Sequence, residues 1–132
     1  KKLTEHIVII GGGATGVEFA FIYHKYGVAV TIIEAMSSIL PNEDPDISAA
    51  LKKSLTEQGI SIFTDFRITN TDITNQSANL TISNSSEENV LSCDKILVAI
   101  GASANIKSLG LENIDVRTTN GFIRCDLYFR RT

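Results

Sequence analysis

The sequence lacks the features that would point to a nucleic acid or a membrane. Its 132 residues carry 12 basic and 15 acidic side chains, so there is no basic surplus for a nucleic-acid groove or an anionic lipid surface. No apolar run approaches the roughly 20 residues of a membrane-spanning helix. The first residues, KKLTEH, carry no signal-peptide pattern. We therefore expect neither nucleic acid nor membrane among the partners.

Cysteine and histidine are scarce, with two of each. Cys93 and Cys125 lie too far apart for a C-x-x-C pair or a metal-ligand spacing, so we interpret both as reduced structural thiols. His6 and His24 have no base or nucleophile partner in the sequence, and we predict no catalytic residue and no metal site. Reduced thiols suit a reducing compartment. We expect the cytoplasm, with a mitochondrial or other organelle matrix as the alternative.

The most informative segment is 7–34, IVIIGGGATGVEFAFIYHKYGVAVTIIE. An apolar strand runs into a turn in which Gly11, Gly13 and Gly16 fit G-x-G-x-x-G. A helical pattern, a second apolar strand and then Glu34 follow, close to the spacing of about 20 residues at which an acid binds an adenosine ribose. Strand, turn, helix, strand and acid in this order predict a dinucleotide site. The alternative is a glycine-rich turn in an α/β protein with no ligand.

Each glycine of the turn has its own physical role. Gly11 takes turn angles that a side chain would forbid, Gly13 lets a pyrophosphate approach the main chain, and Gly16 lets the helix pack closely on the strand. The helix directs its free N–H groups and positive dipole end at the phosphates. Glu34 would accept hydrogen bonds from the ribose hydroxyls and repel a 2′-phosphate, and residues 35–44 contain no Arg to neutralise one. This pattern favours NAD(H) over NADP(H).

Two helices are predicted in the first half of the chain. The first runs from about 14 to 26 and ends at Gly27, and its sheet-facing side chains are predicted to be Val17, Ala20, Phe21 and His24. The second has Asp44 as N-cap and Pro45 at its first position, and Gly59 ends it. Its buried stripe is predicted to be Ile47, Leu51 and Leu55. Strands are expected at about 29–33 and 60–63.

The second half changes character. Residues 66–93 are rich in Thr, Ser and Asn with alternating apolar residues, which predicts an antiparallel meander solvated on one face. The continuous apolar run KILVAIG at 95–101 predicts a fully buried parallel strand. The tail is expected to be mostly irregular, with a helical turn at 106–111 and a short strand at 122–123.

The fold predicted is α/β and Rossmann-like, of the FAD/NAD(P)-binding type. A parallel sheet carries helices on one face and the antiparallel β-meander on the other. We expect one domain over residues 1–132, because the length and the 43% hydrophobic content allow a core of its own. The ligand is expected outside the carboxyl ends of the parallel strands.

The whole chain resembles the NAD-binding domain of the flavin-dependent pyridine nucleotide–disulfide oxidoreductases, and it is most like the dihydrolipoamide dehydrogenases. The segments that carry the resemblance are GGGATGVEFA (11–20), YGVAVTIIEAMSSILPNEDPDIS (26–48), LVAIGASANIKSLGLENI (97–114) and GFIRCD (121–126). The extended glycine motif, the ILP-x-x-D stretch and the LVAIG strand together are specific to this superfamily.

The resemblance implies the following cofactor-binding residues: Gly11, Gly12, Gly13, Ala14, Thr15, Gly16, Val17, Glu18, Glu34, Ile68 and Gly101. The segment 11–18 would bind the pyrophosphate and, at Glu18, approach the nicotinamide. Glu34 would hold the adenosine ribose, the main chain of Ile68 would meet the adenine, and Gly101 would let the cofactor pass close to the backbone. The alternatives are an exposed helix glutamate for Glu18 and an ordinary strand residue for Ile68.

Two departures from the family pattern stand out. Relatives often carry a bulky residue in the glycine loop, whereas Ala14 and Thr15 are small, which predicts a more open nicotinamide pocket. Relatives also often read G-R-x-P-N after the returning strand, whereas this chain reads GASAN at 101–105 and lacks the charged donor.

The resemblance further implies that this is the NAD(H)-binding domain of a longer flavoprotein. In such an enzyme electrons pass from dihydrolipoamide to a disulfide, then to FAD, then to NAD⁺. The FAD domain, the C-x-x-x-x-C disulfide and the dimerisation domain are not in this sequence, so we expect an excised domain that binds NAD(H) without turnover, from a homodimeric parent. Its expected interface residues are Phe122, Leu127, Tyr128 and Phe129.

Two alternatives stay open. The same domain could belong to another flavoprotein, such as an NADH dehydrogenase, a mercuric reductase or a transhydrogenase. It could also be a stand-alone NADH-sensing module.

Overall fold

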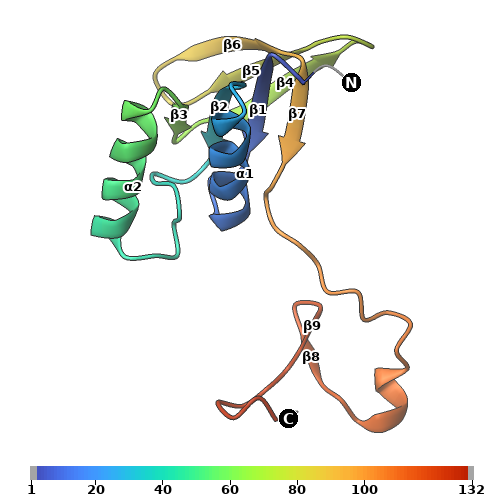
Figure 1. Cartoon of the computed structure of the whole chain (residues 1–132). Coiled ribbons are helices and arrows are strands. Elements are labelled where there is room, and N and C mark those ends of the chain that lie inside the picture. The colour runs from blue at the N-terminus through green and yellow to red at the C-terminus, as the bar shows by residue number, and fades with distance from the viewer. Residues whose placement is uncertain (1–2, 131–132) are drawn as a thin grey trace. The chain divides into compact units, whose positions relative to one another are not determined.

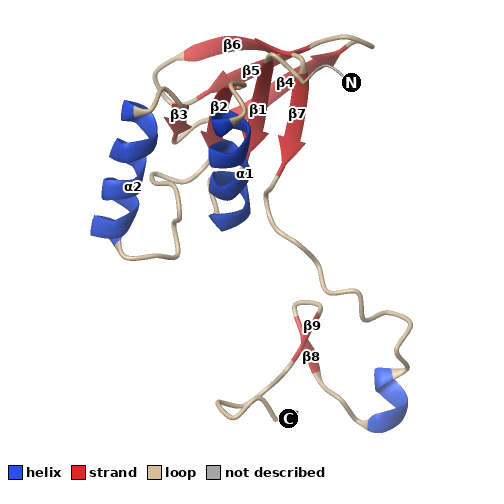
Figure 2. Cartoon of the chain, viewed as in Figure 1, coloured by secondary structure: helices blue, strands red, loops and turns tan. Residues whose placement is uncertain are grey.

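The structure is a computed structural model in which residues 3–130 are described (Figure 1). The described chain forms two compact units that divide after Ile100. The first unit contains both α-helices and the two larger sheets, and the second contains a single 3₁₀ turn and a two-stranded ribbon (Figure 2).

A four-stranded parallel sheet organises the first unit. Its strands are β1 (His6–Ile10), β2 (Ala29–Glu34), β3 (Ser61–Thr64) and β7 (Lys95–Val98), in the order β3-β2-β1-β7. Ile10 is in register with Ile33 on one side and Val98 on the other, so these three strands end together. This common edge is where the predicted ligand site belongs.

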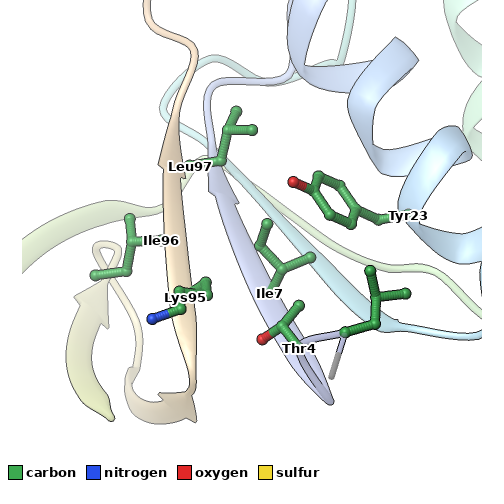
Figure 3. Close-up of a pocket in the computed structure, with 7 residues that line it drawn as sticks. Thr4, Ile7, Tyr23, Lys95, Ile96 and Leu97 are labelled. Atoms are coloured by element: carbon green, nitrogen blue, oxygen red, sulfur yellow. The ribbon is translucent and has the colours of Figure 1, made fainter. Parts of the chain in front are cut away.

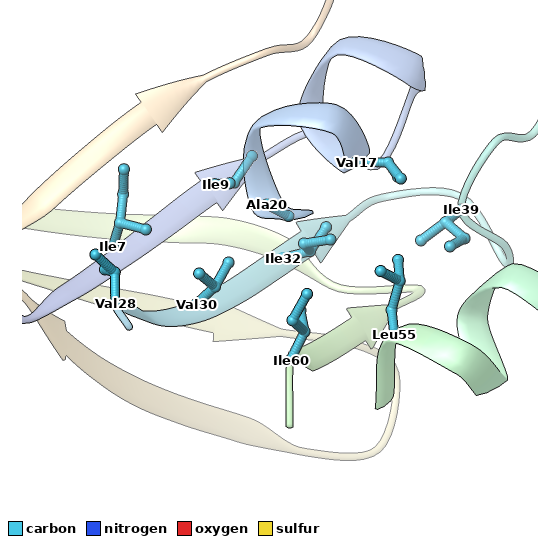
Figure 4. Close-up of a cluster of buried hydrophobic side chains, with 10 residues drawn as sticks. All are labelled: Ile7, Ile9, Val17, Ala20, Val28, Val30, Ile32, Ile39, Leu55 and Ile60. Carbon is cyan, nitrogen blue, oxygen red and sulfur yellow. The ribbon is translucent and has the colours of Figure 1, made fainter. Parts of the chain in front are cut away.

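Helices α1 (Ala14–Lys25) and α2 (Pro45–Glu57) lie on one face of this sheet, as predicted (Figure 1). The Asp44 carboxylate caps α2 by accepting the amide of Asp46 at 2.9 Å, and Pro45 occupies the first turn. Beneath the helices lies a core whose members come from α1, α2, the parallel strands and their connections (Figure 4): Ile7, Ile9, Val17, Ala20, Val28, Val30, Ile32, Ile39, Leu55 and Ile60.

The antiparallel meander covers the opposite face. Its strands are β4 (Arg67–Ile73), β5 (Ala78–Ser83) and β6 (Glu88–Cys93). They enclose a second core made of Val8, Ile33, Phe66, Ala78, Leu80, Ile82 and Cys93. Because successive strand residues point to opposite faces, β1 supplies Ile7 and Ile9 to one core and Val8 to the other. The predicted fold class is therefore confirmed.

Two predictions about the buried faces of the helices are wrong. Phe21 is 44% exposed, with the Lys25 ammonium 5.0 Å from its ring centroid, and Tyr23 packs against the core instead. Ile47 is 60% exposed, and its neighbour Ser48 is buried. The sequence prediction chose Phe21 and Ile47 because they are strongly apolar. Helix geometry instead turns a neighbouring residue of each helix, Tyr23 and Ser48, towards the interior. The predicted burial of Val17, Ala20 and Leu55 is confirmed.

Strand β7 is parallel to β1, as predicted, but it is not fully buried. It ends at Val98, and both Val98 and Ile100 are largely exposed. The reason is its place in the sheet: β7 is an edge strand, and no other strand of the described chain pairs with its outer side. An uninterrupted apolar sequence could not reveal that position.

The second unit contains a 3₁₀ helix, Leu111–Ile114, and the hairpin of β8 (Thr118–Thr119) and β9 (Phe122–Ile123). The predicted strand at 122–123 is confirmed. The predicted helical turn at 106–111 contains one hydrogen-bonded turn, in which the Leu109 amide donates to the Ile106 carbonyl at 3.2 Å, whereas the 3₁₀ helix lies later. The 3₁₀ helix starts after Gly110, because the left-handed backbone of this residue (φ 61°) prevents a helix from running through it. The four predicted interface side chains are exposed: Phe122, Leu127, Tyr128 and Phe129.

The two cysteines are free, as expected, with Cys93 buried and Cys125 exposed. Within the described residues, no helix has the length and apolar character needed to cross a membrane. The same residues contain no group of three or more His, Cys, Asp or Glu side chains arranged to hold a metal ion.

Candidate functional site

The turn between β1 and α1 is held tightly at Gly11. Its amide donates to the Ile33 carbonyl at 2.8 Å, which fixes the turn to the end of β2. Its φ of 107° lies in the region that favours glycine, and an added Cβ would lie 2.5 Å from the Ala99 oxygen. Conformation and space both require glycine here.

Gly16 and Gly13 differ in what surrounds them. A Cβ on Gly16 would overlap the carbonyl oxygen of Gly11, so α1 lies directly against the turn only because this residue has no side chain. Gly13 has an extended backbone that any residue adopts, and a Cβ there would meet no atom within 4 Å. The fold therefore requires glycine at 16, whereas Gly13 leaves open space beside the first turn of α1.

The main-chain donors at the start of α1 face this space without internal partners. The first helical bond runs from the Val17 amide to the Gly13 carbonyl at 3.0 Å. Within the described residues, the amides of Ala14, Thr15 and Gly16 make no hydrogen bond, and no side chain caps the helix. The first turn contains no acidic residue. Free N–H groups and a positive helix end together fit an anionic group such as a phosphate.

Glu34 places a carboxylate against the same turn. It is the last residue of β2 and only 8% exposed. Its Oε2 accepts the Gly12 amide at 2.7 Å and its Oε1 accepts the Met36 amide at 2.7 Å. Each carboxylate oxygen has lone pairs for a second bond, so the group retains the capacity for two further donors. A pair of neighbouring ribose hydroxyls presents donors of that kind.

The connection into the meander also approaches Glu34. The Phe66 amide donates to the Glu34 carbonyl at 3.1 Å, and the Asp65 amide to the Met36 carbonyl at 2.9 Å. Ile68, two positions beyond Phe66, packs its side chain against the meander core. The adenine contact proposed for its main chain stays a prediction.

The remaining predicted site residues are not drawn together in the same way. Glu18 is an exposed side chain on α1, and Val17 packs into the core beneath that helix. The chain follows β1 as far as Ala99, whose amide donates to the Ile10 carbonyl at 2.7 Å. Gly101 begins the second unit, with a φ of 128°. The cofactor contacts predicted for Glu18 and Gly101 stay predictions.

The sequence prediction missed the contribution of the loop between β2 and α2. The Leu40 amide donates to the Gly12 carbonyl at 2.8 Å, and the Ser48 hydroxyl donates to the Leu40 carbonyl at 3.1 Å. The ILP-x-x-D stretch was the available signal, because it marks this loop as part of the family pattern. Nothing in that pattern indicated which atoms reach the glycine turn.

A second carboxylate lies at the amino end of the sheet. Asp94 Oδ2 accepts the amides of His6 and Glu5 at 2.9 and 2.8 Å and the Thr4 hydroxyl at 3.2 Å. These main-chain bonds, led by that of His6, lower the pKa of Asp94. The imidazole of His6 lies between the Ser92 carbonyl and the Thr31 hydroxyl, and this arrangement suits a structural role.

A surface cavity of about 370 Å³ lies beside the amino halves of β1 and β7, below the last turns of α1 (Figure 3). Tyr23 extends from α1 towards it, and Ile7 and Leu97 line it from the sheet. None of its lining residues belongs to the glycine turn, and its walls offer no cluster of charged groups. The cavity is therefore separate from the site described above.

The comparison with protein families identifies the family of the chain. The family model described as pyridine nucleotide-disulphide oxidoreductase matches residues 1–132. This chain belongs to that family. Its relatives include the dihydrolipoyl dehydrogenases of Bacillus subtilis, 39% identical over 125 residues and 93% of this chain, and of Chlorobaculum tepidum, 38% identical over 128 residues and 96% of this chain.

Solved structures of this oxidoreductase family resemble the chain in fold as well. The HOCl-induced flavoprotein disulfide reductase RclA from Escherichia coli superposes with a TM-score of 0.80 at 30% identity, over 100% of this chain and 30% of that one. LpdA from Mycobacterium tuberculosis superposes with a TM-score of 0.75 at 29% identity, over 91% of this chain and 26% of that one. The chain spans about a quarter of the length of the curated relatives, which are 26% and 27% covered.

Proposed function

We propose that this chain binds NAD(H) at the turn 11–17 and Glu34, as the nucleotide-binding part of a flavin-dependent oxidoreductase of the dihydrolipoyl dehydrogenase type. Enzymes of this family use FAD and a pyridine nucleotide. FAD would be held by parts of a longer parent protein, since the relatives are about four times as long as the matched region. The parent's dimerisation is part of the same proposal.

The observation that carries the proposal is the bond between Glu34 and the Gly12 amide. It fixes a carboxylate next to a helix start that has open space beside Gly13 and three amides without a partner in the described part of the chain. A dinucleotide offers what this arrangement lacks, namely phosphate oxygens for the amides and ribose hydroxyls for the carboxylate. One ligand with both groups satisfies the two halves of the site.

The charge of Glu34 favours NAD(H) over NADP(H). A 2′-phosphate would face the Glu34 carboxylate, which two amides hold in place. The carboxylate could not turn away from the phosphate without losing these hydrogen bonds. Residues 35–44, which follow it, contain no Arg to pair with such a phosphate. The cost of placing like charges together selects the unphosphorylated ribose.

In an intact enzyme this domain would orient the nucleotide. The nicotinamide supplies hydride-transfer chemistry when it is bound. This chain's residues would bind the pyrophosphate at the α1 amides and fix the ribose at Glu34. Glu18, on the exposed side of α1, would lie towards the nicotinamide end.

The similarity to RclA supports a second candidate. That protein is a flavoprotein disulfide reductase, and it covers this chain completely at 30% identity. The nucleotide site would be the same, and the parent's electron acceptor would differ. The higher identity of 38–39% to dihydrolipoyl dehydrogenases favours the first candidate.

The test is a titration of the protein with NADH and with NADPH, followed by calorimetry and by backbone amide shifts. We expect tighter binding of NADH, with the largest shifts at residues 11–18 and 34. Tighter binding of NADPH would contradict the role of Glu34. No binding of either at millimolar concentration would contradict the proposed site.

A further inference from the structure

Gly12 is held by hydrogen bonds at both its amide and its carbonyl. Its amide donates to Glu34, and its carbonyl accepts the Leu40 amide at 2.8 Å. Behind it lies Ile39, fully buried, whose Cγ2 would be 3.0 Å from a Cβ on Gly12. The loop after β2 passes between α1 and α2 (Figure 1), and the bond from Leu40 to Gly12 fixes it to the glycine turn.

Leu40 has an unusual backbone for a side chain of its size. Its φ of 47° lies in the left-handed region, which leucine seldom adopts. The conformation is stabilised at both ends of the residue: its N–H bonds to Gly12, and its carbonyl accepts the Ser48 hydroxyl at 3.1 Å and the Glu43 amide at 3.0 Å. An unfavourable conformation persists where the surroundings determine it in this way.

Ser48 connects this loop to α2. It is 2% exposed and takes the place in the buried face of α2 that the sequence pattern assigned to an apolar side chain. A buried hydroxyl is unfavourable unless it has a partner, and the Leu40 carbonyl is that partner. A hydrogen bond thus fixes the first turns of α2 to the loop, in addition to the apolar core that both share.

We propose that Leu40 and Ser48, together the Gly12 brace, are positioning residues that fix Gly12 and, through its amide, the Glu34 carboxylate. The expected effect of the brace on nucleotide affinity rests on the proposed function. Its expected effect on the position of Gly12 does not, because it applies to the ligand-free protein. The ILP-x-x-D stretch is thereby assigned a role: it forms a support behind the nucleotide-binding turn.

The decisive experiment compares backbone amide spectra of the ligand-free wild type and Ser48→Ala. We expect the Gly12 and Leu40 amide signals to move and both amides to exchange with solvent faster in the variant. NADH affinity should fall about fivefold, the effect of one ordinary hydrogen bond. Ser48→Thr keeps the hydroxyl and should restore both the signals and the affinity.

Two further variants separate positioning from stability. Thr56→Ala removes a hydroxyl-to-carbonyl bond of the same kind from the exposed end of α2, where Thr56 donates to Lys52 at 2.8 Å, and should leave Gly12 unchanged. Leu40→Gly keeps both main-chain bonds and suits the left-handed backbone, so it should preserve the Gly12 amide signal. If Ser48→Ala fails to fold, an altered Gly12 signal in Leu40→Gly would still overturn the brace.

The outcomes are distinguishable. Unchanged Gly12 and Leu40 signals in a less stable Ser48→Ala would show that Ser48 only stabilises α2, and would overturn the brace. Altered Gly12 signals in Leu40→Gly would assign the effect to side-chain packing and overturn it as well. Signals that move in Ser48→Ala, in a protein whose wild type binds no nucleotide, would support the brace and contradict the proposed function.

Discussion

The two ends of the parallel sheet each carry a carboxylate that accepts main-chain amides. Glu34 at the carboxyl end divides its bonds, one to each oxygen, and so keeps acceptor capacity on both. Asp94 at the amino end uses a single oxygen, Oδ2, for two amides and a hydroxyl. The first lies beside open space and helix amides that bind no other group within residues 3–130, and the second joins the start of β1 to the start of β7.

The difference shows that a carboxylate that accepts main-chain amides is not by itself evidence of a binding site. Both carboxylates are fixed by the backbone, but of the two only Glu34 lies beside helix amides that have no partner among the described residues. Asp94 binds two amides and one hydroxyl through Oδ2 and acts as a structural link between the start of β1 and the start of β7. We therefore predict that changes at the two ends of the sheet affect different properties: stability at Asp94 and nucleotide affinity at Glu34.

Asp94→Ala is expected to cause the largest loss of stability. The amides of Glu5 and His6 and the Thr4 hydroxyl would lose their common acceptor, which loosens the first strand of the sheet. The urea midpoint should fall, while NADH affinity measured on the folded protein stays at the wild-type value. A loss of affinity at unchanged stability would contradict the division between the two ends.

Glu34→Gln should have the complementary effect. The amide side chain keeps one acceptor oxygen and loses the charge, so one of the two amide bonds and part of the ribose binding are lost. Bonds to a charged group contribute about 1.5–3 kcal/mol, which corresponds to NADH binding weaker by roughly 10- to 100-fold.

The same variant should also narrow the preference for NADH over NADPH, because the repulsive charge is gone. Asp94→Asn is the matched control, since it makes the same chemical change at the other end of the sheet. An unchanged NADH/NADPH ratio in Glu34→Gln would contradict the account of specificity.

Acid titration of stability gives a smaller effect and tests the Asp94 link directly. Its main-chain bonds lower the pKa of Asp94 in the folded protein. A lowered pKa adds stability above the ordinary aspartate value of about 3.9, and that stability is lost as the pH falls from there through the folded-state pKa. Asp94→Asn should flatten this part of the curve of unfolding free energy against pH. An identical acid slope in the variant and the wild type would contradict the link.

The sequence predicted the order and type of the elements because their signals are local. A glycine motif between apolar strands, a cap at Asp44 and a break at Gly59 act within a few residues. The sequence prediction failed where the burial of a residue depends on segments that are distant in the sequence. The apolar run at 95–101 could not reveal an edge strand, and hydrophobicity selected Ile47 rather than Ser48 for the buried face of α2.

The candidate site divides in the same manner. Gly11, Gly16 and Glu34 could be found from spacing, because the motif itself places them at strand ends. The Leu40 and Ser48 bonds could not, since they depend on a left-handed residue and a buried hydroxyl that no spacing rule describes. The open space beside Gly13 could not be predicted from spacing either, because it depends on how distant segments pack around the turn.

Gly13→Ala tests the central claim most directly, with NADH affinity and thermal stability measured on the same sample. Its backbone suits alanine and its Cβ meets no atom within 4 Å, so stability should change by less than about 1 kcal/mol. NADH affinity should fall by at least about tenfold, because the methyl group fills the space left for the pyrophosphate. Gly16→Ala, whose Cβ overlaps the Gly11 carbonyl, should lose both properties. Wild-type affinity in a folded Gly13→Ala protein would contradict a dinucleotide at this turn.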